Sequence, residues 1–121
     1  MPEEVVFLDD FNLIEVRSFG KVSKKNIEKT VFEIVKIQTE KHAFRVLVDT
    51  TKQTEMPNPT EIYNIFTDFP SDVKVALLTN ANQKTEKEIY FCETVAINNG
   101  KMFKIFVNRN DAIKWLGIKK D

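Results

Sequence analysis

The pattern of apolar and polar residues begins with a β-hairpin. Residues 5–8 are an apolar run, and in residues 13–19 apolar side chains alternate with Glu15 and Arg17, which is the period of a strand. Residues 9–12 carry two aspartates and an asparagine, which favour a turn. The second strand of this hairpin is therefore predicted to be half buried.

Three further strands are expected after the hairpin. Residues 44–48 are apolar on both faces, as is typical of a strand that helices cover on each side, and Asp49 should end this strand. Residues 73–78 and 102–107 are two more apolar segments of strand length. With the hairpin, these segments predict five strands.

Four helices are expected, each with its own start or stop signal. The signals are an N-cap at Ser23, the sequence Asn-Pro-Thr-Glu at residues 58–61 with a stop at Pro70, a capping box before residues 86–97 with Gly100 beyond, and an N-cap at Asn108 with Gly117 at the end. Apolar residues follow the helical period on one face of each helix. They include Ile27, Val31, Ile34 and Val35 in the first helix, Ile62, Ile65, Phe66 and Phe69 in the second, and Ala112, Ile113 and Leu116 in the last.

The element order β-β-α-β-α-β-α-β-α predicts an α/β fold. Alternation of strands and helices calls for a five-stranded, mostly parallel mixed sheet with right-handed crossovers and helices on its faces. The first strand should run antiparallel at or near an edge. A length of 121 residues is typical of one domain, so residues 1–121 are expected to form a single unit.

Composition narrows the class of protein. Hydrophobic residues make up 42% and charged residues 30%, the balance of an ordinary globular protein. Eighteen basic residues offset eighteen acidic ones, so the chain has no net field for a phosphate backbone, and we do not expect nucleic-acid binding. Residues 1–4 are acidic instead of signal-like, and no apolar stretch could span a bilayer, so the cytoplasm is the expected compartment.

Reactive side chains are few, and a structural role explains each of them more simply than a catalytic or metal-binding role. Cys92 is the single cysteine and shares a helical face with apolar residues, so it is expected to be a small buried hydrophobe. His42 is the single histidine and is expected at the surface, so we predict no metal site and no cofactor. Paired carboxylates lie in a turn and at a helix start, where acidic residues are common: Asp9, Asp10, Glu86 and Glu88. We expect no enzyme activity.

Polar residues follow several of the predicted strands. Ligands of open α/β sheets favour the crevice outside the carboxyl ends of the strands, where these residues should cluster. They are Asp49, Thr50, Thr51, Thr79, Asn80 and Asn108. Loop hydrogen bonds and helix capping explain them more simply than a ligand does, and no glycine-rich turn indicates a phosphate site.

Several of these segments, taken in order, resemble the SpoIIAA-like family. The resemblance covers nearly the whole chain and consists of apolar core positions and turn residues. It is carried by residues 93–100, 103–106 and 111–116, by the strands at residues 45–49 and 74–78, and by Gly20. It implies the fold of STAS domains, which is related to the CRAL-TRIO fold. Members of the first group switch protein partners, and members of the second carry hydrophobic molecules.

The resemblance also indicates one candidate for modification. In bacterial anti-sigma-factor antagonists, a serine near the start of the second helix, after an Asp-Ser-Ser-type sequence, is phosphorylated. Residues 57–60 of this chain read Pro-Asn-Pro-Thr, so the serine pair is missing and Thr60 is the hydroxyl left beside the helix N-terminus.

The chain has more apolar residues on the second and third helices than their inward faces require. Ten phenylalanines stand beside two tyrosines and one tryptophan. Such a surplus lines a cavity, forms an interaction patch or fills a thick core. The ligand-binding residues predicted from it are Ile62, Tyr63, Phe66, Phe69, Tyr90, Phe91 and Val95.

Two functions therefore stay open at the level of the sequence. The first is a non-enzymatic domain that holds a lipid-like hydrophobic molecule between these helices and the sheet. The alternative is a STAS-like interaction module that binds a regulatory protein through the surface around Thr60, Tyr63 and Phe66. A homodimer formed through the same surface is a third arrangement.

Overall fold

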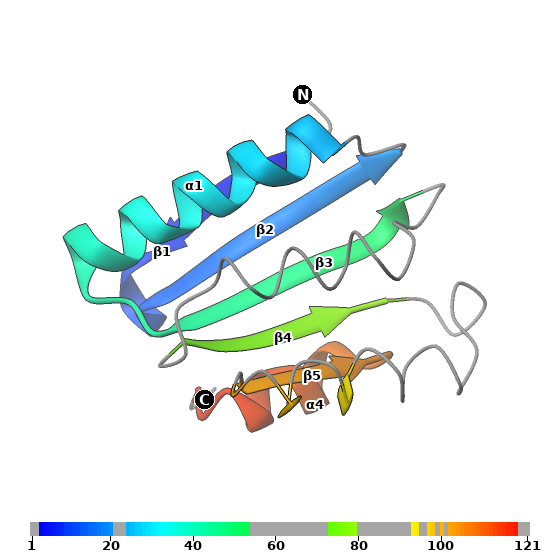
Figure 1. Ribbon diagram of the computed structural model, residues 1–121. Coiled ribbons are helices and arrows are strands. Elements are labelled where there is room, and N and C mark those ends of the chain that lie inside the picture. The colour runs from blue at the N-terminus through cyan, green and yellow to red at the C-terminus, as the bar shows by residue number, and fades with distance from the viewer. Residues whose placement is uncertain are drawn as a thin grey trace.

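The five expected strands pair into one mixed sheet (Figure 1). This computed structural model describes residues 3–20, 24–53, 73–79, 93–94, 97–98, 100 and 102–118. The strands are β1 (Glu3–Leu8), β2 (Leu13–Gly20), β3 (Arg45–Gln53), β4 (Lys74–Leu78) and β5 (Met102–Phe106), in the spatial order β1-β2-β3-β4-β5. Strand β1 is antiparallel to β2, and the other pairs are parallel. The predicted α/β sheet with an antiparallel edge strand is confirmed.

The predicted hairpin is present at the start of the chain. A short 3-10 helix, η1 (Asp9–Phe11), connects β1 to β2, and Asn12 follows it with φ 50° in the left-handed region, which asparagine tolerates better than most residues. The Asn12 amide donates a hydrogen bond to the Asp9 carbonyl. The carboxylates of Asp9 and Asp10 are thus part of a turn, as expected.

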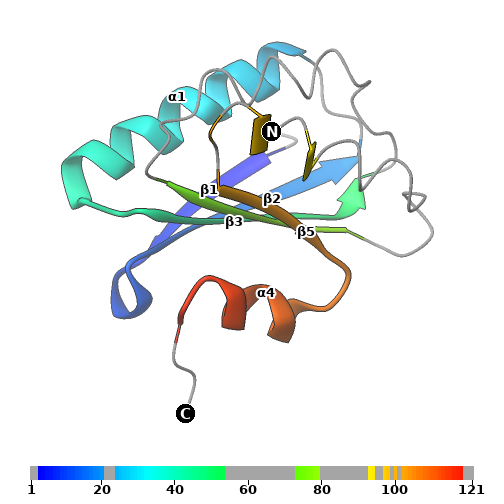
Figure 2. The ribbon, with the colours of Figure 1, turned by 60° about the horizontal axis from the view of Figure 1, so that its bottom comes forward.

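Helix α1 (Lys24–Lys41) covers one face of the sheet (Figure 2). Val31 and Ile34 are buried against Ile14, Val16 and Val46, and the other predicted inward residues, Ile27 and Val35, pack at the margin of this core. Beyond the helix, His42 is exposed with φ 53°, and the Ala43 amide donates to the Gln38 carbonyl, as in a Schellman ending.

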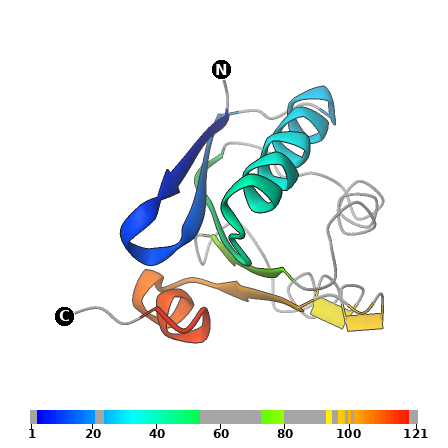
Figure 3. The same ribbon diagram turned by 90° about the vertical axis from the view of Figure 1, so that its left-hand side faces the viewer.

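Helix α4 (Arg109–Trp115) covers the opposite face (Figure 3). Asn108 is its N-cap, since the side-chain oxygen accepts hydrogen bonds from the amides of Asn110 and Asp111, as predicted. Ala112 and Leu116 complete a second apolar cluster on this face of the sheet. That cluster contains Leu13, Leu47, Ala76, Leu78, Ala112 and Leu116.

One strand differs from the prediction. Strand β3 does not end at Asp49 but continues to Gln53, so Thr50, Thr51 and Lys52 are in the sheet and not in a loop. The reason is that its parallel neighbour β2 runs to Gly20 and pairs with this extension. Hydrogen bonds to a neighbouring strand outweigh the weak strand preference of a polar segment.

The second predicted helix, at residues 58–69, lies outside the residues that the structure describes. Of the third, at residues 86–97, the structure describes residues 93, 94 and 97, which are helical, as is residue 98. Within the described part of the chain, no helix is both long enough and apolar enough to cross a membrane.

Candidate functional site on the α4 side of the sheet

Helix α4 covers only part of its face of the sheet. It packs on β4 and β5 and on the first residues of β2. Farther along β2 and β3, toward their carboxyl ends, the same face carries charged side chains and one phenylalanine. They are Glu4 from β1, Glu15, Arg17 and Phe19 from β2, and Asp49 and Lys52 from β3. This part of the sheet is the candidate site.

Glu15 is the buried centre of the charged group. Its side chain is only 1% exposed. One carboxylate oxygen accepts hydrogen bonds from Arg17 Nε at 2.8 Å and pairs with Arg17 Nη2 at 2.7 Å, and the other pairs with Arg109 of α4. The expectation of a half-buried strand β2 is therefore wrong at this position, because two arginine side chains and the start of α4 cover the polar face. Two guanidinium groups offset the cost of removing the carboxylate from water.

Arg17 extends the charged group to the edge of the sheet. Its Nη1 lies 3.2 Å from Glu4 Oε1 on β1. Hydrogen bonding with Glu15, helped by its negative charge, raises the pKa of Arg17 above the ordinary arginine value. Arg17 therefore remains charged and bound to two carboxylates.

A β-bulge in β3 decides which side chains join this group. Arg17 pairs with Asp49 and Phe19 pairs with Lys52, so two steps along β2 match three steps along β3. In a regular strand, residues 49 and 52 would point to opposite faces. The extra residue brings both to the α4 side, as bulges near binding sites commonly do. Asp49 Oδ1 accepts hydrogen bonds from the Thr51 amide at 2.9 Å and its hydroxyl at 2.6 Å, which stabilises the bulge.

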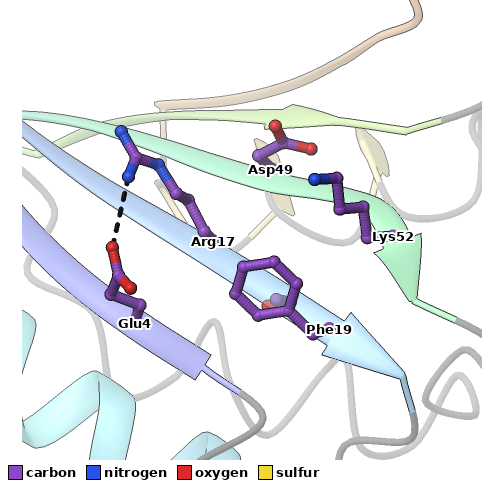
Figure 4. A pocket seen from close by; sticks show the side chains of 6 residues that line it. Glu4, Arg17, Phe19, Asp49 and Lys52 are labelled. Carbon is purple, nitrogen blue, oxygen red and sulfur yellow. Dashed lines mark hydrogen bonds and ion pairs between the residues drawn. The ribbon is translucent and has the colours of Figure 1, made fainter.

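These side chains surround a pocket of about 330 Å³ (Figure 4). Its lining residues are Glu4, Arg17, Ser18, Phe19, Asp49 and Lys52. Lys52 Nζ lies 5.8 Å from the centroid of the Phe19 ring, which is 37% exposed. Asp49 Oδ2 lies 4.0 Å from Arg109 Nη1, which links the pocket to α4. The arrangement offers charges of both signs above an apolar ring, and it suits binding of a polar molecule.

Comparison with known proteins identifies the fold. No family model matches the chain, and no curated protein does. Among solved structures, the anti-sigma factor antagonist SpoIIAA in its unphosphorylated form superposes with a TM-score of 0.60 at 9% identity, over 98% of this chain and 99% of that chain. The chain has a SpoIIAA-like fold.

Two further solved structures share the SpoIIAA-like fold. An uncharacterised protein of the DUF3478 family from Shewanella loihica PV-4, with a SpoIIAA-like fold, has a TM-score of 0.59 at 15% identity, over 94% of this chain and 91% of that chain. The protein TM1081 has a TM-score of 0.60 at 14% identity, over 95% of this chain and 88% of that chain. At such identities the likeness concerns the fold, which the sequence resemblance had indicated correctly.

Within the SpoIIAA-like fold, the polar residues predicted at the carboxyl ends of the strands have mostly structural roles. The Thr50 hydroxyl donates to the Leu78 carbonyl at 2.8 Å, and Asn108 caps α4. Thr79 is buried, and its amide donates to the Phe106 carbonyl. Of the described members of this set, Asp49 alone lines the pocket, together with residues that the sequence did not single out.

The other predicted site residues lie outside the described residues, and so they stay predictions. They are Thr60, Ile62, Tyr63, Phe66, Phe69, Asn80, Tyr90, Phe91 and Val95, and Cys92, predicted to be a buried hydrophobe, also lies outside them. The residues that sequence reasoning missed are Glu15, Arg17, Lys52 and Arg109. A signal existed for the first two, since opposite charges two residues apart in a strand share one face. No local signal marks the other two.

Proposed function

We propose that this chain is a non-enzymatic, cytoplasmic, STAS-like module that binds a regulatory partner protein. The observation that carries the proposal is the match to SpoIIAA, which extends over nearly the full length of both chains. That protein is named as the antagonist of an anti-sigma factor, so it acts on another protein. A shared fold alone does not define a function, so the chemistry of the charged group has to be compatible with binding as well.

The chemistry of the charged group favours binding over catalysis. A general base needs a carboxylate oxygen that can reach a substrate proton. Both oxygens of Glu15, the buried carboxylate of this group, are paired with arginines, so neither is left to take a proton from a substrate. Pairing of this kind holds a surface rigid, which favours recognition.

For the partner surface we retain the region predicted from the sequence. Tyrosine and phenylalanine supply large contact areas at interfaces, and tyrosine is common among the residues that dominate binding energy. Tyr63 and Phe66 meet this description. Thr60, beside them in the sequence, is the residue whose phosphorylation would place a double negative charge on the same surface.

The test begins with affinity capture of the tagged chain from its own cells. Each captured candidate is then purified, and binding of the two pure proteins is measured by calorimetry. We expect a one-to-one complex that Tyr63→Ala weakens by roughly tenfold or more. Phe32→Ala is the matched control, because Phe32 is an aromatic residue of α1 with 70% of its side chain exposed. This variant should bind like the wild type.

Two results would contradict the proposal. One is that no captured protein binds the pure chain directly. The other is a lipid that co-purifies in near-equal amount, detected by solvent extraction and mass spectrometry. That lipid would favour the hydrophobic-ligand hypothesis and would direct mutagenesis to Tyr90, Phe91 and Val95.

A further inference from the structure

We propose that the pocket beside Phe19 is a binding site for a small zwitterion of the size of a free amino acid. This proposal does not depend on the proposed function, because no residue of the predicted partner surface enters its argument. Three properties of the pocket support the inference. They are its volume, the hydrogen-bonding groups that its charged side chains leave unused, and the net charge of its described lining.

The volume suits a small molecule. At about 330 Å³ the pocket is near the lower end of the range for ligand sites, roughly 300–1,000 Å³. Phe19 provides an apolar surface at one side of the pocket, and Figure 4 shows its ring between the charged groups of β1 and β3. A ligand with a short apolar part can therefore pack on the ring while its charged ends reach the strands.

Arg17 lines the pocket, but its guanidinium is already bound to carboxylates of the protein. Its guanidinium pairs with Glu15 and, through Nη1, with Glu4. These contacts use the groups through which arginine would clamp an incoming anion. Arg17 is therefore less available to a ligand than the charged side chains on β3.

Lys52 and Asp49 each keep a charged group that can bind a ligand. The only contact that the structure records for the Lys52 ammonium, among the residues it describes, is the Phe19 ring at 5.8 Å, so none of its three N–H donors is used within this part of the chain. Oδ2 of Asp49 is 4.0 Å from Arg109, beyond hydrogen-bonding distance, so this oxygen can still accept. The structure describes both residues and records no ion pair between them.

The charge of the lining selects the class of ligand. Among the described lining residues, Glu4 and Asp49 contribute two negative charges, and Arg17 and Lys52 contribute two positive charges, so this part of the lining is neutral. A simple anion at Lys52 would lie near the Asp49 carboxylate, and a simple cation at Asp49 would lie near the Lys52 ammonium. A zwitterion satisfies both, with its carboxylate at Lys52 Nζ and its ammonium at Asp49 Oδ2.

The bulge supports the idea that this arrangement is specific. Without the extra residue of β3, Lys52 would leave the α4 side of the sheet and the pocket would contain one charge of the pair. The hydrogen bonds from Thr51 hold Asp49 Oδ1 and leave Oδ2 directed elsewhere. The backbone irregularity and the polar contacts thus act together to present the two charges.

The experiment is a titration of the full chain, monitored by calorimetry and by NMR shifts of the Phe19 ring. The probes are glycine, L-alanine, L-leucine, L-phenylalanine, L-glutamate and L-lysine, with acetate and methylamine as single-charge controls. We expect saturable binding of at least one amino acid at concentrations where acetate and methylamine do not bind. Lys52→Met and Asp49→Asn should each weaken it by roughly tenfold or more.

Lys104→Met is the matched control. Lys104 lies 5.6 Å from the Phe106 ring on β5, a similar lysine–phenylalanine pair outside the pocket, so its loss should leave the affinity unchanged. Three results would overturn the proposal: no saturation by any amino acid up to about 10 mM, acetate binding as tightly as the amino acids, or equal losses for Lys52→Met and Lys104→Met. Because Lys52 is exposed and methionine keeps its apolar stem, the first variant remains a valid test if Asp49→Asn fails to fold.

Discussion

Among single residues, Glu15 has the carboxylate whose burial costs the most free energy unless it is paired. Among the side chains that the structure describes, it is the charged one in the buried set. Burial of a charge is tolerated when ion pairs and hydrogen bonds replace water, and here Arg17 and Arg109 supply them from two different elements. The same residue therefore anchors the charged surface and the first turn of α4.

We predict that Glu15→Gln lowers the free energy of unfolding by about 1–3 kcal/mol, because it removes charge-assisted hydrogen bonds from a buried site. The loss should stay within this range since Arg17 and Arg109 are partly exposed and can be rehydrated. Urea denaturation followed by circular dichroism measures it.

The matched control for this prediction is Glu4→Gln. Glu4 also pairs with Arg17, but its side chain is 54% exposed, and a surface pair of this kind contributes about 0–1 kcal/mol. Equal stability losses in the two variants would show that burial of Glu15 is not what makes its pairing important.

At the scale of elements, α4 is too short to be stable by itself. An isolated helix of seven residues does not form in water, so α4 depends on its ends and on the sheet. Its start is held by the Asn108 cap and by the pairing of Arg109 with Glu15. At its end, Lys74 Nζ donates to the Trp115 carbonyl at 2.6 Å and lies 4.5 Å from the centre of the Trp115 ring.

We predict that Asn108→Ala lowers stability by about 1 kcal/mol, because the amides of Asn110 and Asp111 lose their acceptor. Asn110→Ala, two residues after the cap in the first turn of the same helix and at an exposed position, should have no effect or should stabilise slightly, since alanine favours helix. Thermal melting of the three proteins separates these outcomes. A loss in Asn110→Ala as large as that in Asn108→Ala would argue against the cap.

At the scale of the whole molecule, the central strands connect the two apolar layers. Neighbouring residues of one strand alternate between the clusters: Leu13 and Ile14 in β2, Val46 and Leu47 in β3, and Val75 and Ala76 in β4. Loss of either layer would expose one face of the same strands. The layers on the α1 and α4 sides should therefore unfold together.

We predict a single cooperative unfolding transition. Trp115 is the one tryptophan of the chain and packs in the α4 layer at 5.8 Å from the Phe106 ring, so its fluorescence reports that layer. Far-UV circular dichroism reports mainly α1, the longest described helix. The two signals should give the same urea midpoint. Separate midpoints would show that the layers fold independently and would contradict a single domain.

The candidate site was much less predictable than the fold. Of the residues that line the pocket, the sequence singled out Asp49 and interpreted it as the end of a strand. Lys52 lies beyond the predicted end of that strand, because its place in the sheet depends on pairing with Phe19 and on a bulge. The predicted hydrophobic site on the second and third helices lies outside the described residues and stays open to the ligand and partner experiments above.

Local patterns in the sequence were enough to predict the described strands and helices and their inward faces, except the end of β3. Strand and helix periods, the Asn108 cap and the turn before Leu13 are local, because they depend on residues within a few positions of one another. The burial of Glu15 and the shared face of Asp49 and Lys52 depend instead on contacts between segments that are far apart in the chain. Glu15 and Arg109 are 94 positions apart, and the bulge arises between two strands from different parts of the chain. Contacts between distant segments leave no period in the sequence, so folding alone brings these charges together.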